Sequence, residues 1–375
     1  MDIRSVRGMH DLFGDELRQW ITVENRVKSI FDTFGFSEIR TPALEQLEVF
    51  SRSVGDDSDI VQKQMYVIEK ESETLVLRPE GTASFVRAVL QHNLMNLGDS
   101  QRYFYYLPMF RHERPQKGRQ RQFHQFGAEI ILDPTPEADC EIIALMDRIF
   151  RSFGLTEFTL EINSVGCSDC RPKYRQVLSA FLKPHLSKLC EQCQARFERS
   201  PMRILDCKNP DCQAVVAKAP TILDSLCDPC RAHHAGLKSC LKLADVPFVE
   251  NPKIVRGLDY YMRTAFEFLS GLLGAQSALG AGGRYDGIAS QFGAKPFPGV
   301  GFGMGMERLM LALAAKTLIP KAAEDCTFFL APMGEASYEH LFKLSFALRR
   351  KGLSSIMQYK KDKGLKNLLK DASGL

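Results

Sequence analysis

The sequence predicts an α+β fold in which a largely antiparallel sheet is flanked by helices. Strand-like segments follow one another with few helical segments between them that could serve as crossovers. Residues 103–110 and 123–132 are rich in aromatic and aliphatic side chains, and the turn-forming stretch 115–118 lies between them, which is typical of a long β-hairpin. With 375 residues, 45% of them hydrophobic, the chain can bury a full core and has room for two or three domains.

The elements are expected in a definite order along the chain. Apolar residues recur at helical spacing over residues 15–34, and Gly35 follows as a stop signal. After this helix we expect strands at 37–40 and 74–77, a helix at 81–95, the hairpin, a helix at 136–153, strands at 156–163, 254–268 and 298–304, and a helix at 307–315.

The last fifty residues follow a different pattern. A strand at 327–331, a helix at 338–351, a strand at 354–358 and the start of a helix at 364–369 form a βαβα run, which predicts a parallel sheet. Residues 325–375 contain nine Lys and Arg against five Asp and Glu, so they carry the whole net charge of +4. This bias favours an RNA backbone as a partner, although a basic surface that serves only solubility is an equal alternative.

Composition limits the environment of the protein. The N-terminus has no apolar stretch behind a basic start, and no span is long enough for a membrane. We therefore expect a soluble, cytoplasmic protein whose eleven cysteines are thiols or metal ligands and not disulfides.

The tip of the hairpin is strongly basic. Five cations lie within eleven positions, and like charges this close are unfavourable unless an anion neutralises them: Arg111, Arg114, Lys117, Arg119 and Arg121. A triphosphate would serve, whereas the alternative is a solvated basic loop. The next segment favours a binding site, because Phe123, Gln125 and Glu129 share one face of a strand and put an aromatic ring, an amide and a carboxylate beside the arginines.

These residues resemble a known family. Phe110, Arg111 and Glu113, followed by Arg119, Phe123, Gln125 and Glu129, resemble motif 2 of class II aminoacyl-tRNA synthetases in its histidyl version. Four further segments agree with the signatures of bacterial histidyl enzymes, namely RPEGT at 78–82, RGLDYY at 256–261, GGRYD at 282–286 and the motif 3-like stretch 298–313.

The resemblance implies a reaction and a domain organisation. It implies ATP-dependent activation of L-histidine and its transfer to tRNA(His), with Mg²⁺ as the companion of ATP and with a homodimer formed through the segment 15–40. It also implies a catalytic domain over residues 1–322, an insertion over 167–245, and the first part of an α/β anticodon-binding domain over 325–375. Because that domain continues further in the family, we expect the sequence to be truncated; the alternative is a half-sized domain with an unpaired sheet edge.

The resemblance also assigns roles to individual residues. For ATP it implies Arg111 on the α-phosphate, Arg119 and Arg308 on the β- and γ-phosphates, Phe123 on adenine, and Glu113 on adenine or magnesium. For histidine it implies Glu129 and Tyr261 on the ring nitrogens, Glu80, Thr82 and Gln125 near the α-amino group, and Tyr260 and Tyr285 around the pocket, with ordinary core packing as the alternative for the three tyrosines. Arg256 is expected to contact both the α-phosphate and the histidine carboxylate, where related synthetases use a metal ion.

A cysteine-rich stretch predicts a metal site inside the insertion. Eight cysteines occur in closely spaced pairs, which is typical of tetrahedral zinc sites: Cys167 and Cys170, Cys190 and Cys193, Cys207 and Cys212, and Cys227 and Cys230. The simplest set is Cys190, Cys193, Cys227 and Cys230, which implies one structural Zn²⁺, with two ions or free thiols as alternatives.

Two other classes of function remain open at this point. One is a regulatory paralogue that resembles the histidine-sensing subunit of ATP phosphoribosyltransferase, which the short C-terminus favours and the complete basic hairpin disfavours. The other is a zinc-stabilised RNA-binding protein without catalysis, which leaves the apolar hairpin face and the alternating glycines Gly299, Gly301, Gly303 and Gly305 unexplained.

Overall fold

The computed structural model describes residues 3–54, 60–255, 260–274, 277–321, 327–361 and 363–373. It divides into two compact units, Met1–Pro320 and Lys321–Leu375. Among the described residues, every helix is too short or too polar to cross a lipid bilayer.

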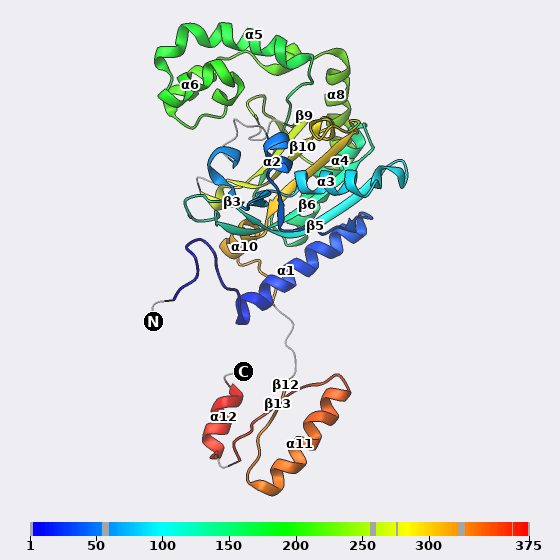
Figure 1. Ribbon diagram of the computed structural model, residues 1–375, viewed down its shortest axis with the longest axis vertical. Helices are drawn as coiled ribbons and strands as arrows, with labels where there is room; N and C mark the ends of the chain where they lie inside the picture. The colour runs from blue at the N-terminus through cyan, green and yellow to red at the C-terminus, as the bar shows by residue number, and fades with distance from the viewer. Residues whose placement is uncertain are drawn as a thin grey trace. The chain divides into compact units, whose positions relative to one another are not determined.

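An eight-stranded sheet forms the centre of the first unit (Figure 1). Its strands lie in the order β1-β5-β6-β11-β10-β9-β7-β8, and only the outer pairs β1–β5 and β7–β8 are parallel. The bounds are β1 (Ser37–Glu38), β5 (Gln101–Phe110), β6 (Gln122–Ile131), β7 (Thr159–Ser164), β8 (Val249–Glu250), β9 (Met262–Leu269), β10 (Ala278–Arg284) and β11 (Gly299–Gly305). The predicted α+β class and the predicted hairpin, β5 with β6, are confirmed.

Helices cover both faces of this sheet. On one face the apolar core contains residues of α1 (Gly14–Thr33), α4 (Pro136–Ser152) and α10 (Met306–Ala315) together with Phe126, Ala128 and Ile130 of β6. On the other face, α3 (Thr82–Gln91) and α9 (Ile288–Gln291) pack with Phe123 and Ile131. The alternation along β6 therefore places Phe123, Gln125 and Glu129 on the second face, as the period of two predicts.

A smaller sheet lies beside α3. Its strands lie in the order β2-β4-β3 and are β2 (Leu44–Gln46), β3 (Tyr66–Glu69) and β4 (Thr74–Leu77). Helix α2 (Leu47–Val54) and the π-helical turn η1 (Ile60–Gln64) lie between β2 and β3 in the sequence. Elsewhere in this unit, the 3-10 turn η2 (Leu94–Asn96) follows α3, and the 3-10 turn η6 (Gly271–Leu273) follows β9.

The cysteine-rich insertion is helical. Its α5 and α6 lie apart from the large sheet, whereas α8 reaches back and packs against α4 (Figure 1). Its elements are α5 (Cys170–Leu182), η3 (Lys183–Lys188), α6 (Glu191–Arg199), η4 (Pro201–Ile204), α7 (Pro210–Val216), η5 (Ile222–Ser225) and α8 (Asp228–Leu243). Its buried core is small and includes the side chains of Cys170, Cys193, Cys212 and Cys230.

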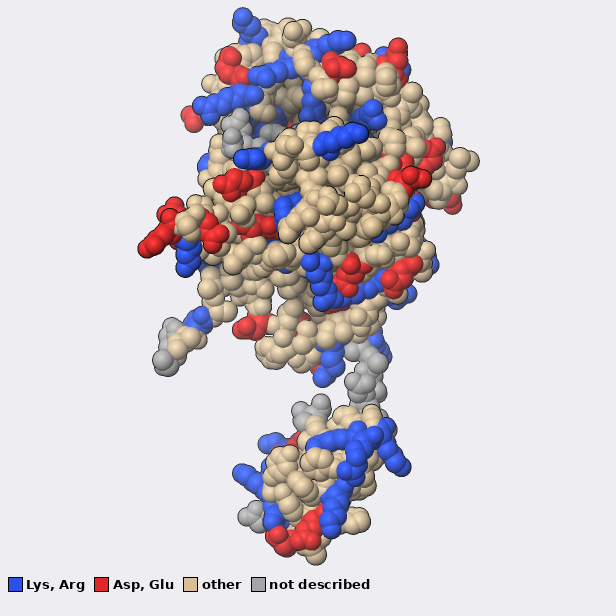
Figure 2. Space-filling view, turned by 45° about the vertical axis from the view of Figure 1, so that its right-hand side comes forward, with Lys and Arg blue, Asp and Glu red and all other residues tan. Residues whose placement is uncertain are grey.

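The second unit confirms the βαβα pattern. β12 (Thr327–Leu330) and β13 (Ser354–Met357) pair in parallel, and α11 (Glu335–Arg350) and α12 (Leu365–Ser373) follow them in turn. Figure 2 shows Lys and Arg side chains gathered on one face of this unit. Arg349, Arg350 and Lys351 at the end of α11 are exposed.

One sequence-based expectation about strands was wrong, and a strand of the large sheet was missed. The strand expected over 254–268 begins at Met262, because Ile254 and Val255 lie outside regular structure and 256–259 fall outside the described residues. β10 was not predicted as a strand. Its glycines are needed for close packing of strands: a Cβ on Gly282 would lie 2.1 Å from the Gly301 carbonyl oxygen, and one on Gly283 2.4 Å from that of Thr264.

Candidate active site

A cleft of about 500 Å³ opens on the second face of the large sheet. Its walls come from the hairpin, from β10, from the junction of β11 and α10, and from α6 and η4 of the insertion. The predicted site residues that line it are Glu80, Thr82, Arg111, Glu113, Arg119, Phe123, Gln125, Tyr260, Tyr261 and Arg308. Glu129 and Tyr285 are not among the lining residues, and Arg256 lies outside the described residues.

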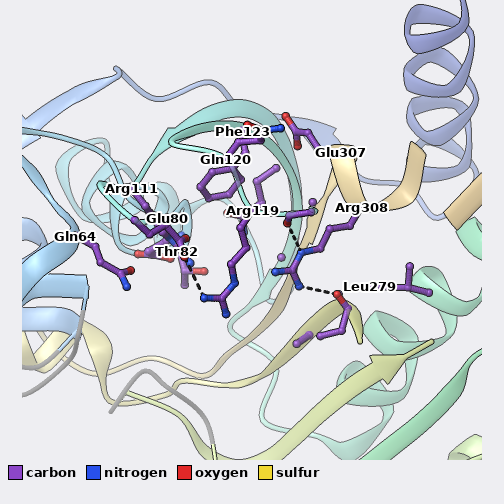
Figure 3. Close-up of a pocket in the computed structure, with 18 of the residues that line it drawn as sticks. Gln64, Glu80, Thr82, Arg111, Arg119, Gln120, Phe123, Leu279, Glu307 and Arg308 are labelled. Carbon is purple, nitrogen blue, oxygen red and sulfur yellow. Dashed lines mark hydrogen bonds and ion pairs between the residues drawn. The ribbon is translucent and has the colours of Figure 1, made fainter. Parts of the chain in front are cut away.

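Three arginines converge at one end of the cleft. Arg119 extends between Arg111 on one side and Arg308 on the other (Figure 3). Arg111 Nε donates to the Pro79 carbonyl (2.8 Å), and Arg308 donates from Nε to the Gly118 carbonyl (3.0 Å) and from Nη1 to the Ala278 carbonyl (2.7 Å). These main-chain contacts hold both guanidinium groups in place before any ligand arrives.

The arginines repel one another electrostatically. Burial lowers the pKa of the Arg308 guanidinium, and the charges of Arg119 and Arg111 lower it further. The Glu113 carboxylate offsets part of this repulsion through an ion pair with Arg119 at 3.1 Å. An anion that enters this end of the cleft therefore relieves an existing repulsion.

An aromatic ring lies beside the arginines. The Phe123 ring centroid is 5.2 Å from the Arg111 guanidinium carbon, which is cation–π geometry. The neighbouring backbone is fixed because the Glu307 carboxylate accepts from the His124 N–H (2.9 Å) and contacts the His124 ring nitrogen (3.1 Å). His124 thus links β6 to the start of α10.

The cleft also has buried carboxyl groups, and Glu80 lies beside Arg111 (Figure 3). Glu80 accepts the backbone N–H groups of Thr82 and Ala83, both at 2.7 Å, and so caps the first turn of α3. Burial raises the pKa of Glu80, while these two N–H groups and the charge of Arg111 oppose the rise.

Glu129 is completely buried just behind the cleft. Its Oε1 accepts from the Thr82 hydroxyl (2.9 Å) and the Tyr105 hydroxyl (3.3 Å), and its Oε2 accepts from the Tyr285 hydroxyl (2.7 Å). Burial raises the pKa of Glu129 to about 8, although the hydroxyl groups of Tyr285 and Thr82 work in the opposite direction. The side chain is therefore mainly a neutral carboxylic acid at pH 7.

Glycines in β11 make room for this network. A Cβ on Gly301 would lie 1.6 Å from Glu129 Oε2, one on Gly303 2.0 Å from Gln125 Nε2, and one on Gly299 2.3 Å from the Tyr285 ring. The space beside these three glycines is therefore filled by the side chains of Tyr285, Glu129 and Gln125.

Sequence reasoning missed Tyr105. Its ring occupies the space above two glycines, because a Cβ on Gly81 or Gly127 would come within 2.3 Å or 2.0 Å of it. A tyrosine on the strand paired with Gly127 was the available signal, but the pairing register is needed to read it. The cleft also contains Gln64 and Gln120, which no motif indicated.

The aromatic residues after the undescribed stretch 256–259 lie against the same site. The rings of Tyr260 and Tyr261 are 4.7 Å apart, and Tyr260 meets Tyr285 edge to face at 6.2 Å. Both residues line the cleft and are almost fully buried. Their roles in histidine binding stay predictions.

The cysteines form two clusters of four, and the pairing favoured from spacing was wrong. Cluster 1 is Cys167, Cys170, Cys227 and Cys230, and cluster 2 is Cys190, Cys193, Cys207 and Cys212; within each, the sulfur atoms lie within 4.8 Å of one another. The pair at 227–230 meets the pair at 167–170 because α8 returns beside the start of α5. Spacing along the chain carries no information about which pairs meet across such distances.

The clusters fit a tetrahedral ion. Zinc–sulfur bonds of about 2.3 Å in a tetrahedron place the sulfur atoms about 3.8 Å apart. The distances are 3.5 Å from Cys167 to Cys170, 3.7 Å from Cys167 to Cys227 and 3.9 Å from Cys190 to Cys207. Two described clusters can therefore bind a metal ion.

Comparisons with known proteins point to one family. The family profile of histidyl-tRNA synthetases matches residues 8–309. The chain is 43% identical to a histidine–tRNA ligase of Geobacter sulfurreducens, covering 98% of this chain and 88% of that protein, and 46% identical to one of Trichlorobacter lovleyi, covering 94% and 83%.

Solved structures share the fold. The apo histidyl-tRNA synthetase of Staphylococcus aureus superposes with a TM-score of 0.82 at 31% identity, covering 99% of this chain and 89% of that one. A Bacillus halodurans protein described as an ATP phosphoribosyltransferase regulatory subunit/histidyl-tRNA synthetase gives a TM-score of 0.69 at 22% identity, which indicates the fold alone. This chain belongs to the histidyl-tRNA synthetase family.

Proposed function

We propose that this chain is a histidine–tRNA ligase that activates L-histidine with ATP and transfers the histidyl group to tRNA(His). The observation that carries the proposal is one cleft that combines two kinds of chemical group. Three guanidinium groups converge in it, and a buried network of carboxyl and hydroxyl groups lies behind its wall.

In the first step the histidine carboxylate attacks the α-phosphorus of ATP. The bond from that phosphorus to the bridging oxygen breaks, and diphosphate leaves with the electron pair. Both reactants are anions, so fixed cations must screen their repulsion. Arg111 takes the α-phosphate, and Arg119 and Arg308 take the β/γ end. Preorganised charges of this kind contribute about 3 to 4 kcal/mol each to transition-state stabilisation.

Mg²⁺ enters with ATP as part of the substrate. It prefers oxygen ligands and is usually held by one or two carboxylates together with phosphates. Glu113 lies at the arginine end, with its carboxylate 3.1 Å from Arg119, and fits this need. We assign Glu113 to the ion or to the adenine edge.

Histidine selection requires a partner for each ring nitrogen, because a buried donor or acceptor left unpaired costs about 1 to 3 kcal/mol. Glu129 and Tyr261 are the proposed partners. Thr82 lines the cleft and donates to Glu129 Oε1, so an entering ring N–H competes for that oxygen. Glu80 and Gln125 are proposed for the α-amino group, and Tyr260 and Tyr285 close the pocket.

The proposal extends to the parts around the cleft. Residues 1–322 form the catalytic domain with the insertion at 167–245, and residues 325–375 form part of an anticodon-binding domain whose exposed cations Arg349, Arg350 and Lys351 suit an RNA backbone. A homodimer through the region of α1 and β1 belongs to the same proposal. Phe13, directly before α1, is 77% exposed and is available to a partner subunit.

Diphosphate exchange with each of the twenty amino acids tests this function. Histidine alone should support exchange, and tRNA(His) should then accept the histidyl group. Histidine binding without exchange would identify a regulatory paralogue instead. If the protein showed neither histidine binding nor exchange, the assignment of the cleft would be refuted.

A further inference from the structure

We propose that each cysteine cluster holds one Zn²⁺ and that the ion in cluster 2 positions two arginines of the insertion, Arg196 and Arg203, in the catalytic cleft to bind substrate phosphate. The inference rests on the proposed function. It makes the second ion part of the active-site architecture as well as of the insertion's stability.

The geometry of cluster 2 suits thiolate ligands. Cys190 is the N-cap of α6, and Cys193 lies in its first turn. The backbone N–H of Cys190 lies 3.2 Å from the Cys212 sulfur, and that of Asn209 lies 3.5 Å from the Cys207 sulfur. Such N–H groups stabilise negative sulfur, and four sulfurs at metal-ligand separations would repel one another as thiolates without a cation.

The chain between the ligands reaches the cleft. Arg196 follows Cys193 by one helical turn, Arg203 lies in η4 four residues before Cys207, and Asp206 is adjacent to Cys207. These three residues line the same cleft as Arg111, Arg119 and Arg308. The cleft-facing part of the insertion is therefore the segment that cluster 2 closes at both ends.

Apart from the cysteines, a small apolar core holds that segment, with Leu189, Ile204 and Leu205 among its buried residues. The core of the insertion consists of short helices and turns, and four of its buried side chains are cysteines of the two clusters. Small cores of this kind usually need a staple such as a structural metal. An ion in cluster 2 fixes the ends of α6 and η4 together, which a few buried aliphatic side chains would do less firmly.

Cluster 1 has a different position. Cys167 follows β7, where the chain leaves the large sheet, and Cys227 is the N-cap of α8, along which it returns. α8 is fixed to the body through His233, whose ring nitrogen is 2.7 Å from Asp139. An ion in cluster 1 therefore joins the two chain segments that connect the insertion to the large sheet, whereas the ion in cluster 2 acts at the cleft.

The ligand of Arg196 and Arg203 is a phosphate group. The cleft already contains three arginines for the triphosphate, so the additional cations suit either the far end of ATP or the phosphates of the RNA strand that must bring its terminal ribose into the cleft. Asp206 also lines the cleft, and its carboxylate pairs with Lys208 at 2.7 Å. Kinetics separate the two sources of phosphate.

The test combines metal content with kinetics on the full chain. Metal analysis should give two zinc ions per wild-type chain and one in Cys207→Ser and in Cys227→Ser. Cobalt substitution should give sulfur-to-metal charge-transfer absorption that falls by half in each variant. Fewer than two ions in the wild type, or two ions retained in Cys207→Ser, would overturn the metal assignment.

The kinetic arm uses Arg203→Ala and Arg196→Ala, which leave every cysteine in place and should retain two zinc ions. Each substitution should raise the KM for the substrate whose phosphate is bound, either ATP or tRNA, roughly tenfold or more, as expected for loss of a charge-assisted contact. A rise for ATP in diphosphate exchange identifies nucleotide phosphate, and a rise for tRNA in aminoacylation identifies RNA phosphate. Arg199→Ala is the matched control. Arg199 lies in α6, as Arg196 does, but it is exposed and does not line the cleft.

Cys207→Ser should reproduce the rise seen with Arg203→Ala. Fluorescence of Trp20, the single tryptophan, reports whether the catalytic body stays folded in that variant. If both variants leave both KM values unchanged, the positioning role is refuted. Failure of the proposed function looks different, because the wild type itself would then give no histidine-dependent exchange while its zinc content could still be two.

Discussion

The buried carboxyl group of Glu129 makes the stability of the catalytic unit depend on pH in an unusual direction. Its pKa is about 8 in the folded chain, mainly because of burial, against an ordinary value of 4.5. Between these values the folded state holds a proton that the unfolded state has released. The contribution of this proton to the free energy of unfolding is therefore complete below pH 4.5 and is lost as the pH rises through 8.

The size of the effect follows from the two pKa values. Each pH unit inside the window changes the free energy of unfolding by about 1.4 kcal/mol, and allowing for partial titration at the ends gives a loss of about 3.5 kcal/mol between pH 5 and pH 8. Glu129→Gln replaces the neutral acid by a neutral amide of the same shape and cannot titrate. The wild type should thus lose about 3.5 kcal/mol relative to this variant over that range.

Urea unfolding followed by Trp20 fluorescence measures this difference. Trp20 donates to the Tyr106 hydroxyl at 2.6 Å and belongs to the core of the first unit, so its signal reports the unit that contains Glu129. Comparing two proteins at each pH cancels other titrating groups. Glu71→Gln removes an exposed carboxyl group and controls for the loss of one charge. A gap between wild type and Glu129→Gln that stays within about 1 kcal/mol from pH 5 to pH 8 would refute the reasoning.

Three further substitutions test the site. Arg256→Ala should abolish adenylate formation while largely preserving ATP binding; near-normal turnover would remove Arg256 from the catalytic residues. Gly301→Ala should destabilise the catalytic unit by about 3 kcal/mol, because its Cβ would lie 1.6 Å from a carboxyl oxygen, whereas Gly287→Ala meets nothing within 4 Å and should be tolerated in the same urea titration. Phe123→Ala should raise KM for ATP in diphosphate exchange roughly tenfold, the usual cost of losing a stacked base, with Phe123→Tyr near normal; an unchanged KM would show that adenine does not stack there.

The sequence predicted those features that depend on local periodicity. The hairpin, the shared face of Phe123 and Gln125, and the helix that begins near Arg308 all follow from spacings of two or of three to four residues. Each needs information from a single segment only.

Features that depend on contacts between distant segments could not be predicted in this way. The pairing of Cys167 with Cys227 joins positions sixty residues apart, and the hydrogen bond from Tyr285 to Glu129 joins positions even further apart. The neutral state of Glu129 is a property of burial, which the sequence pattern did not reveal. β10 was missed because its glycines are explained by the close approach of the neighbouring strands, which a local pattern does not show.

The arginines of the cleft and the hydrogen-bond network of Glu129 show why such a site must be built from distant segments. Arg111 and Arg119 come from one hairpin, and their repulsion is tolerable only because Glu113 offsets part of it and because carbonyl groups of other segments hold Arg111 and Arg308. Glu129, in contrast, is kept neutral by burial, although the hydroxyl groups of Thr82, Tyr105 and Tyr285 act in the opposite direction. Without ligands, the protein therefore keeps unfavourable positive charge on the arginines and suppresses negative charge on Glu129. A negatively charged triphosphate relieves the repulsion among the arginines, so part of its affinity comes from a strain that the fold imposes in its absence, whereas a ring N–H that favours the ionised carboxylate must offset the cost of removing the proton from Glu129.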